Sequence, residues 1–164
     1  MDHEAESVDA RAPWQGVPPE RRRIMAANRR RDTTPELRLR SQLHRLGLRF
    51  RVDFPLCVEG RRPIRPDIVF TRGHIAVFVD GCFWHGCPEH GSTPKTNQSY
   101  WTQKIARTRE RDSEAGLLLQ QSGWTVLRIW EHEPVPNAAE RIFETLRALP
   151  ESLVPSPAQV FTPQ

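Results

Sequence analysis

The sequence predicts an α/β fold in which a mixed β-sheet is flanked by helices. Two observations lead to this class: β-rich runs and segments of helical periodicity alternate along the chain, and the elements follow the order α-β-β-β-α-β-α. A length of 164 residues, with 37% hydrophobic residues, suits one domain with a core of ordinary size. The expected helices span 33–46, 99–121 and 137–149, and the expected strands span 48–53, 64–70, 75–80 and 124–131.

Residues that start or stop helices set the expected helix boundaries. Thr33 is expected to cap the first helix, with Pro35 in its first turn, and Gly47 is expected to end it. Ser99 and Asn137 are the expected caps of the second and third helices. Each helix therefore has its own start signal in the sequence.

Two of the strands are predicted to form a hairpin. The segments 64–70 and 75–80 are rich in β-branched residues, and the short connection 71–74 contains Gly. The segment 48–53 alternates apolar with charged residues, which predicts a half-buried strand. The fourth strand, 124–131, reads WTVLRIWE.

The chain is expected to divide into a disordered leader at 1–19, a single domain at 20–149 and a Pro-rich flexible tail at 150–164. The stretch 20–31 is basic and is expected to form a short helix along a phosphate backbone. The sequence has neither an apolar leader nor a run of the roughly 18 apolar residues that a membrane span requires. These features predict a cytoplasmic protein without membrane association.

Positive charge is concentrated in the first half of the chain. Residues 11–72 contain 16 Arg against 6 Asp and Glu, and the whole sequence has 22 Arg but 2 Lys. The planar guanidinium group binds phosphate through two hydrogen bonds, so this bias fits a nucleic-acid partner. A genome of high GC content would produce the same bias, and composition alone leaves both explanations open.

Cysteine and histidine residues form a potential metal site. Cys82, Cys87 and His90 lie within nine residues, and His132 follows the last predicted strand. Two thiolates and two imidazoles are a suitable set for a tetrahedral Zn²⁺ ion, and such an ion would attach a long irregular loop to the sheet. The alternative is a pair of buried free thiols with two surface histidines. Cys57 lies far from this group and is expected to be a packing residue.

Two carboxylates are predicted to meet at one edge of the sheet. Asp67 opens the first strand of the hairpin, and Asp80 ends the second. Carboxylates in this arrangement hold Mg²⁺ against a phosphate in nucleases, whereas each residue taken alone is better explained by a turn. His85 follows closely and is a potential general base near neutral pH.

Aromatic residues gather in the irregular segment and at the start of the next helix: Phe83, Trp84, Tyr100 and Trp101. Two of these rings in a core would be unremarkable. Several rings in a polar, irregular segment also suit insertion between base pairs of DNA.

The segment 80–88, DGCFWHGCP, resembles the signature of the very short patch repair (Vsr) DNA mismatch endonucleases. The resemblance covers about residues 20–149 and leaves the two tails outside. Its further blocks lie at 32–36, 65–70, 100–105, 109–112 and 123–132.

The resemblance implies an enzyme that nicks duplex DNA 5′ to the thymine of a T:G mismatch, which arises when 5-methylcytosine is deaminated. Repair synthesis then replaces a short patch, and the implied partners are mismatched double-stranded DNA, mismatch-repair proteins and patch-synthesis proteins. The implied fold has a restriction-endonuclease-like core with a structural zinc site. The implied location is the bacterial cytoplasm, at the nucleoid.

The resemblance also assigns roles around a catalytic Mg²⁺ ion. Asp67 and the backbone carbonyl of Val79 correspond to metal contacts, His85 to the histidine that activates water, and Glu36 to a glutamate that reaches metal-bound waters. Asp80 departs from the best-known family pattern, which has histidine there; metal support, orientation of His85 and a strand-end turn remain open roles.

One feature of related nucleases is missing. The wider superfamily carries Glu/Asp-x-Lys on the second hairpin strand, whereas residues 78–80 read FVD. The usual metal carboxylate and lysine are therefore absent, which places more of the expected chemistry on His85.

Two further groups of residues acquire roles from the resemblance. The structural zinc positions are Cys82, Cys87, His90 and His132. The expected DNA contacts are Phe83, Trp84, Trp101 and Lys104. Two other readings stay open: a restriction or defence endonuclease that ignores mismatches, and a non-catalytic zinc-clamped DNA-binding module.

Overall fold

The computed structural model describes residues 19–20, 31–58, 61–91 and 97–148. The segments expected to be a leader, a basic helix and a Pro-rich tail lie outside this part of the chain, apart from residues 19–20 and 31. The elements are α2 (Thr34–Arg45), β1 (Arg51–Val52), β2 (Ile68–Phe70), β3 (Ile75–Asp80), α3 (Gln98–Gln121), β4 (Thr125–Trp130) and α4 (Val135–Arg147).

The four strands form one mixed sheet in the order β1-β2-β3-β4. β1 and β2 pair antiparallel, as do β2 and β3, whereas β3 and β4 pair parallel. The parallel pair needs a crossover, and α3 provides it. The predicted α/β class, with its hairpin and helix-flanked mixed sheet, is confirmed.

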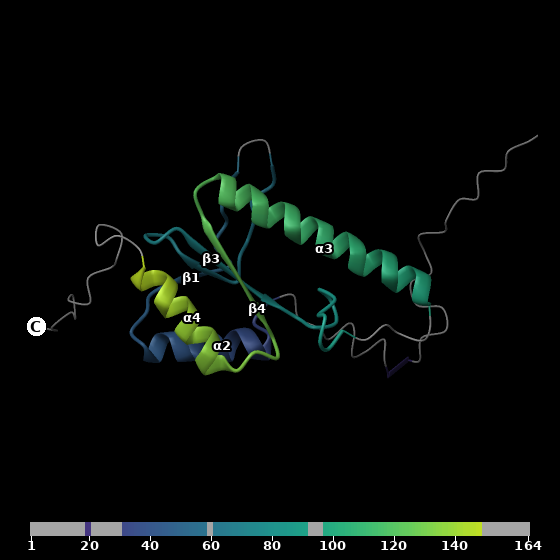
Figure 1. Ribbon diagram of the computed structural model, residues 1–164, viewed down its shortest axis with the longest axis horizontal. Helices are drawn as coiled ribbons and strands as arrows, with labels where there is room; N and C mark the ends of the chain where they lie inside the picture. Colours follow the sequence, from purple (N-terminus) through teal and green to yellow (C-terminus); the bar gives the residue numbers. More distant parts are fainter. Residues whose placement is uncertain (1–18, 21–30, 59–60, 92–96, 149–164) are drawn as a thin grey trace, which may run out of the picture.

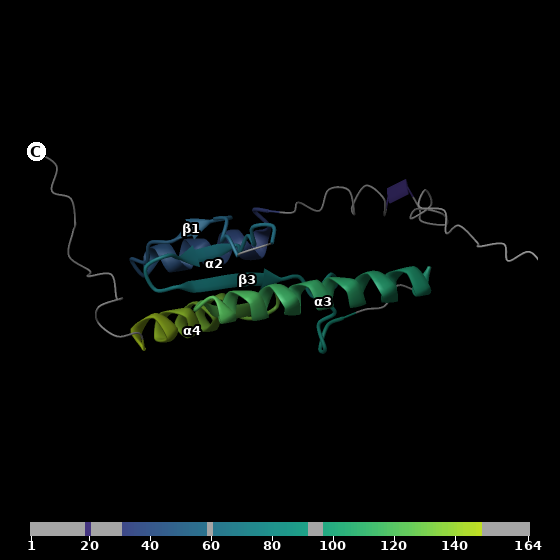
Figure 2. The ribbon, with the colours of Figure 1, turned by 90° about the horizontal axis from the view of Figure 1, so that it is seen from above.

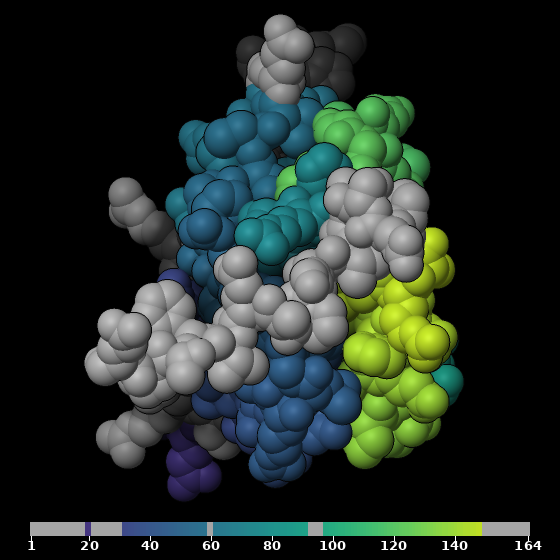
Figure 3. Space-filling model, turned by 90° about the vertical axis from the view of Figure 1, so that its left-hand side faces the viewer, coloured from purple at the N-terminus to yellow at the C-terminus, as the bar shows by residue number. Residues whose placement is uncertain are grey.

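Different helices cover the two faces of the sheet. In Figure 1, α3 lies above the sheet, and α2 and α4 lie below it. Seen from the left-hand side of that view, the blue surface of α2 and the yellow-green surface of α4 adjoin one another (Figure 3). The core between these two helices and the sheet includes Leu39, Leu43, Ile68, Val77 and Ile142. The core beneath α3 includes Leu56, Val69, Ala76 and Leu119.

α3 is much longer than the sheet that it covers. It has 24 residues, which corresponds to about 36 Å of helix. Its first half extends beyond the strands, beside the irregular segment that follows β3 (Figures 1 and 2). The ring centroids of Phe83 and Trp101 are 5.3 Å apart, so this half of α3 packs on that segment. The helix thereby supports the loop that carries His85.

The expected strand lengths were partly wrong. The first strand contains only Arg51–Val52 of the expected 48–53, and the second contains Ile68–Phe70 of the expected 64–70. Ile64 forms an isolated bridge with Leu56. Pro63 and Pro66 have no N–H to donate, which prevents a continuous ladder before Ile68.

Two of the expected helix caps were wrong. α3 begins at Gln98 behind Asn97, whose φ is 58°, and not behind Ser99. α4 begins at Val135 behind Pro134, and Asn137 lies inside its first turn. Proline fixes φ near the helical value, so a helix starts readily around two prolines without a polar cap.

Thr33 does precede α2, but its hydroxyl makes no capping bond to a backbone N–H. Instead, Thr33 Oγ1 donates to Glu36 Oε1 at 2.9 Å, and Glu36 Oε2 accepts the backbone N–H of Asp32 at 3.0 Å. The glutamate therefore ties the two residues before the helix to its first turn. Within the described residues, no helix is both long and apolar enough to cross a membrane.

Candidate nuclease site

Asp67 lies immediately before β2 and faces the end of β3. Its Oδ2 atom accepts the backbone N–H of Val79 at 2.7 Å. Burial raises the pKa of Asp67 to about 6; the Val79 amide and Arg40 oppose this, while Glu36 adds to it. The two residues that the sequence assigned to the metal, Asp67 and Val79, are thus in direct contact. A half-buried carboxylate whose negative charge is only partly compensated is a suitable ligand for a cation.

Glu36 lies beside this carboxylate, at the start of α2. It is 3% exposed, and its Oε2 atom accepts Arg40 Nη2 at 2.6 Å. The Arg40 Nη1 atom also donates to Asp32 Oδ1 at 2.5 Å. Glu36 therefore both anchors the residues that precede α2 and forms one half of a buried ion pair. Sequence reasoning did not identify Arg40.

Asp80, the last residue of β3, forms an ion pair with Arg128 of the adjacent strand β4. Arg128 Nε donates to Asp80 Oδ2 at 2.5 Å, and Arg128 Nη2 donates to Asp80 Oδ1 at 2.6 Å. Asp80 is 3% exposed. Two parallel hydrogen bonds of this length form the strongest class of Arg–carboxylate contact.

His85 is held by a carboxylate of α3. Its Nδ1 atom lies 2.6 Å from Asp112 Oδ2 and 3.5 Å from Asp80 Oδ1. Burial raises the pKa of Asp112, but the hydrogen bond from His85 and the charge of Arg128 outweigh it, and the pKa lies below its ordinary value. An ionised Asp112 requires the proton on Nδ1, which leaves Nε2 as the basic nitrogen.

Asp112 and Arg128 were not assigned a role from the sequence, although both left a signal. Asp112 ends one of the blocks that resemble the Vsr family, and Arg128 interrupts the apolar run TVLRIW of β4. A charged residue at a helix-facing position of a strand needs a partner. This requirement would have pointed to a carboxylate such as Asp80.

The four predicted zinc ligands are brought together: the candidate ligand atoms of Cys82, Cys87, His90 and His132 all lie within 4.8 Å of one another. The Cys82 Sγ atom is 3.0 Å from His132 Nδ1, and the Cys87 Sγ atom is 3.7 Å from the same nitrogen. Both cysteines are buried and both histidines are exposed. Two sulfur and two imidazole ligands fit a tetrahedral Zn²⁺ ion.

The surroundings of Cys82 show what a metal would change. Burial raises the pKa of the Cys82 thiol to about 11, and the neighbouring Cys87 and Glu131 add to this effect. The Cys82 backbone N–H donates to Glu131 Oε1 at 2.6 Å, which attaches the loop to the end of β4. A coordinated metal ion would deprotonate the thiol. Cys57 is exposed, so its expected packing role was wrong.

The expected DNA-contacting aromatics form one cluster. Phe83 lies 5.0 Å from Trp84 and 5.3 Å from Trp101, measured between ring centroids. Trp101 is 4% exposed, whereas Phe83 and Trp84 are half-buried. The Lys104 ammonium lies 5.5 Å from the Trp84 centroid and 5.2 Å from that of Trp101. The rings pack on one another, and a cation covers them.

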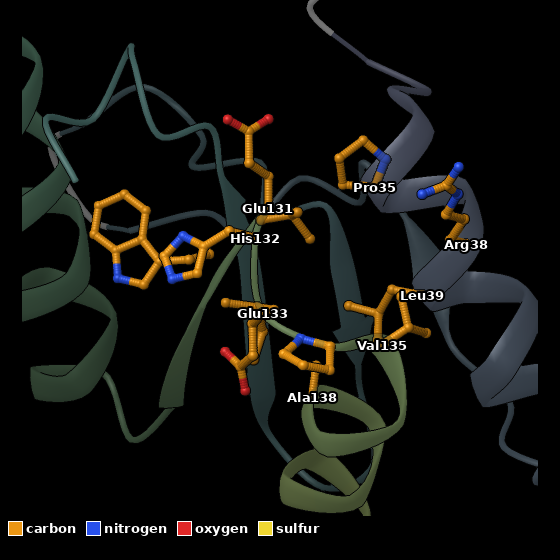
Figure 4. A pocket seen from close by; sticks show the side chains of 12 residues that line it. Pro35, Arg38, Leu39, Glu131, His132, Glu133, Val135 and Ala138 are labelled. Carbon is orange, nitrogen blue, oxygen red and sulfur yellow. The ribbon is translucent and has the colours of Figure 1, made fainter. Parts of the chain in front are cut away.

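A hollow of about 250 Å³ lies between the start of α2 and the ends of β3 and β4. Figure 4 shows Pro35 and Leu39 on one side and the turn before α4 on the other. The carboxylates of Glu131 and Glu133 point in opposite directions. Val79, which contacts Asp67, is among the residues that line the hollow, so it borders the cluster around Asp67.

Comparison with known proteins identifies relatives of the chain. A family model described as DNA mismatch endonuclease Vsr matches residues 17–89. The type II nicking enzyme V.NaeI of Lentzea aerocolonigenes is 50% identical over 129 residues, which is 79% of this chain and 78% of the relative. The type II nicking enzyme V.XorIIP of Xanthomonas oryzae pv. oryzae is 42% identical over 118 residues, covering 70% and 82% of the two chains.

A third relative carries the name of the family itself. The DNA mismatch endonuclease Vsr of Escherichia coli (strain K12) is 38% identical over 115 residues, which is 68% of this chain and 69% of the relative. At this identity and coverage the fold and the family are shared. The chain therefore belongs to the Vsr family of DNA mismatch endonucleases and is a DNA-cleaving hydrolase.

Proposed function

We propose that the chain is a Mg²⁺-dependent endonuclease that nicks duplex DNA 5′ to the thymine of a T:G mismatch and so starts very short patch repair. The observation that carries the proposal is the polar cluster at the end of β3. There, Asp67 contacts the Val79 backbone at 2.7 Å, and His85 contacts Asp112 at 2.6 Å. A metal-binding carboxylate and an oriented base are the two components of metal-assisted phosphodiester hydrolysis.

The residues around Asp67 suit Mg²⁺ by their chemistry. Asp67 and the backbone carbonyl of Val79 would hold the ion, and Glu36 would hydrogen-bond waters bound to it. When bound, Mg²⁺ polarises the scissile phosphate and offsets its charge. Hard oxygen ligands and retained waters are what this ion prefers. Asp80, already paired with Arg128, would support the site without binding the metal.

His85 would accept the proton of the attacking water. Asp112 holds Nδ1, so Nε2 is available for the water, and the imidazole keeps one orientation through the reaction. His85 reaches this place because its loop is attached to both α3 and β4. Cys82, Cys87, His90 and His132 would hold a structural Zn²⁺ that fixes the loop, with no ligand position left open.

Phe83, Trp84 and Trp101 would insert beside the mismatch, and Lys104 would bind a phosphate. A mismatched step unstacks at lower cost than a matched one, which favours T:G DNA without many contacts to base edges. Because the three rings pack on one another, insertion requires at least the half-buried Phe83 and Trp84 to leave these contacts. The Arg-rich segment 11–72 would follow the backbone.

We further propose that one domain, residues 20–149, carries this activity on a restriction-endonuclease-like core, with the leader and tail outside it. The three-layer order and the mixed sheet are consistent with such a core.

A second candidate is nicking without regard to mismatches. The names of two reported relatives specify nicking and do not mention a mismatch. Family membership as a DNA-cleaving enzyme argues against the third reading, a non-catalytic DNA-binding module.

Strand nicking on labelled duplexes tests the proposal. The duplexes carry T:G, T:A or C:G at one position, in several cytosine-methylase contexts, with Mg²⁺ present. We expect cleavage only at T:G, 5′ to the thymine, and none in Asp67→Ala or His85→Ala. Equal cleavage of all three duplexes would replace the mismatch role by mismatch-independent nicking. Unchanged cleavage by Asp67→Ala would overturn the assignment of the metal site.

A further inference from the structure

We propose that Arg128, anchored by Asp80, is a positioning residue that holds Asp112 against His85. The inference rests on the proposed function, in which His85 is the base. Arg128 lies on β4 in register with Phe78 of β3, so its side chain projects from the sheet face that α3 covers. Its guanidinium group reaches Asp80 on β3 and Asp112 on α3, and no other described arginine touches these two carboxylates from the sheet.

Asp80 fixes the guanidinium group. The two short hydrogen bonds to Asp80, at 2.5 and 2.6 Å, use Nε and Nη2 and define the plane of the fork. The side chain of Asp80 is 4% exposed and that of Arg128 is 33% exposed, so water competes little for the carboxylate. Asp80 in turn needs Arg128, because an unpaired buried carboxylate is strongly destabilising.

The remaining donors of Arg128 point to Asp112 on α3. Nη1 donates to the Asp112 backbone carbonyl at 3.3 Å, and Nη2 lies 3.6 Å from Asp112 Oδ2. Oδ2 is also the atom that lies 2.6 Å from His85 Nδ1. One guanidinium group therefore fixes both the main chain and the carboxylate of the residue that orients the base.

Arg128 also decides which carboxylate His85 uses. The Nδ1 atom of His85 lies 2.6 Å from Asp112 but 3.5 Å from Asp80, and a single N–H makes one good hydrogen bond. Because both oxygens of Asp80 are bound to Arg128, the short bond goes to Asp112. Without Arg128, two carboxylates would compete for the same nitrogen and repel each other.

Arg128 supplies a positive charge at the end of β3, where the lysine of related nucleases is absent. Residues 78–80 offer no lysine on β3, and Arg128 brings its charge from the neighbouring strand. Lysine would be a poor substitute, because it is a single point charge and does not reach three acceptors in one plane.

Nicking kinetics test the inference in the zinc-loaded protein with Mg²⁺, using Arg128→Gln, Arg128→Lys and the control Arg147→Gln. We expect Arg128→Gln to lower kcat about ten- to a hundredfold, because a misplaced base costs rate, with KM changed by less than about threefold. Arg128→Lys should lie between Arg128→Gln and wild type. Arg147 is exposed on α4 near Glu144, and its variant should match wild type.

A double-variant cycle shows whether Arg128 acts through Asp112. In the Asp112→Asn background, Arg128→Gln should slow kcat by less than about threefold. Independent, multiplicative losses would overturn the inference. So would Arg128→Gln with the wild-type kcat.

Loss of the fold is addressed by Asp80→Asn/Arg128→Gln, which replaces the ion pair by a neutral amide pair. A folded double variant with reduced kcat and unchanged KM supports the inference, and a wild-type kcat in it would overturn it. Wild-type nicking of T:G DNA and its loss in Asp67→Ala report separately on the proposed function. The nicking rates of the Arg128 variants are compared with the wild-type rate on the duplex that the wild-type protein nicks. A wild-type protein inactive on every duplex would overturn both.

Discussion

Two polar clusters lie near the end of β3, and they are stabilised in opposite ways. In the nuclease cluster, the Asp80 carboxylate is bound to Arg128, and the Asp112 carboxylate is bound to His85. In the Cys/His cluster, two thiols and two imidazoles lie with their ligand atoms within 4.8 Å of one another. Ion pairs and hydrogen bonds among its own side chains hold most of the first cluster, whereas the second has the ligand set of a metal site.

This difference predicts whether a change in each cluster lowers the nicking rate or the stability of the fold. An internally paired cluster keeps its shape when a metal leaves, so removal of Mg²⁺ should cost rate and leave stability unchanged. A cluster of metal ligands depends on the ion for its geometry, so loss of one ligand should affect the fold of the whole loop. Because His85 lies between Cys82 and Cys87 in sequence, the second cluster also controls the first.

Removal of zinc should have the largest effect. We expect a strong chelator, or Cys87→Ser, to lower the thermal midpoint and abolish nicking, and excess Mg²⁺ alone should not restore it. Zinc content, thermal unfolding and nicking are measured together. Cys57→Ser is the matched control, because Cys57 is exposed outside the cluster and should leave all three unchanged. Full activity in a zinc-free protein would show that the loop holds itself.

Asp67 should show the opposite balance between rate and stability. Asp67→Asn should reduce nicking about a thousandfold or more, since metal binding contributes several kcal/mol to catalysis. Its folded pKa is raised to about 6, so the ionised carboxylate favours unfolding at pH values above that. Without Mg²⁺ at pH 7.5, the neutral variant should therefore unfold at the same or a higher temperature than wild type. A large drop in thermal midpoint would contradict this reading. Glu144→Gln, on the exposed face of α4, is the control.

Asp112→Asn should have an intermediate effect. The amide removes the charge that keeps the proton on His85 Nδ1, so we expect kcat to fall about a hundredfold with little change in KM. Steady-state nicking on the preferred duplex measures both constants. A rise in KM at constant kcat would instead place Asp112 in DNA binding.

The sequence predicted what local patterns encode. The hairpin of β2 and β3 followed from two β-branched runs around a Gly-containing turn, and the grouping of two cysteines with two histidines followed from their residue types. Proximity of Asp67 to the end of β3 followed from hairpin geometry. These features depend on spacing along the chain or on the resemblance to a family.

Part of what the sequence did not predict depends on contacts between distant elements. Asp112 and Arg128 meet only after α3 has packed on the sheet, 16 residues apart in sequence. The start of α4 was misplaced because Asn137 is a good cap by type, whereas two prolines moved the start to Val135. The chain has 22 arginines, and composition alone does not distinguish the one that lies inside the site from the others.

Lys104 should show the smallest effect, and it separates DNA binding from packing. Its ammonium lies 5.2 Å from the Trp101 centroid and 3.4 Å from the Tyr100 hydroxyl. If it binds a phosphate, Lys104→Met should weaken binding a few-fold and reduce the slope of log K against log salt by about 1. Fluorescence anisotropy over a range of NaCl concentrations measures the slope. Lys104→Arg keeps the charge and should keep the slope. An unchanged slope in Lys104→Met, with an apolar side chain of similar length still covering the rings, would mean that Lys104 packs on the aromatic cluster without binding DNA.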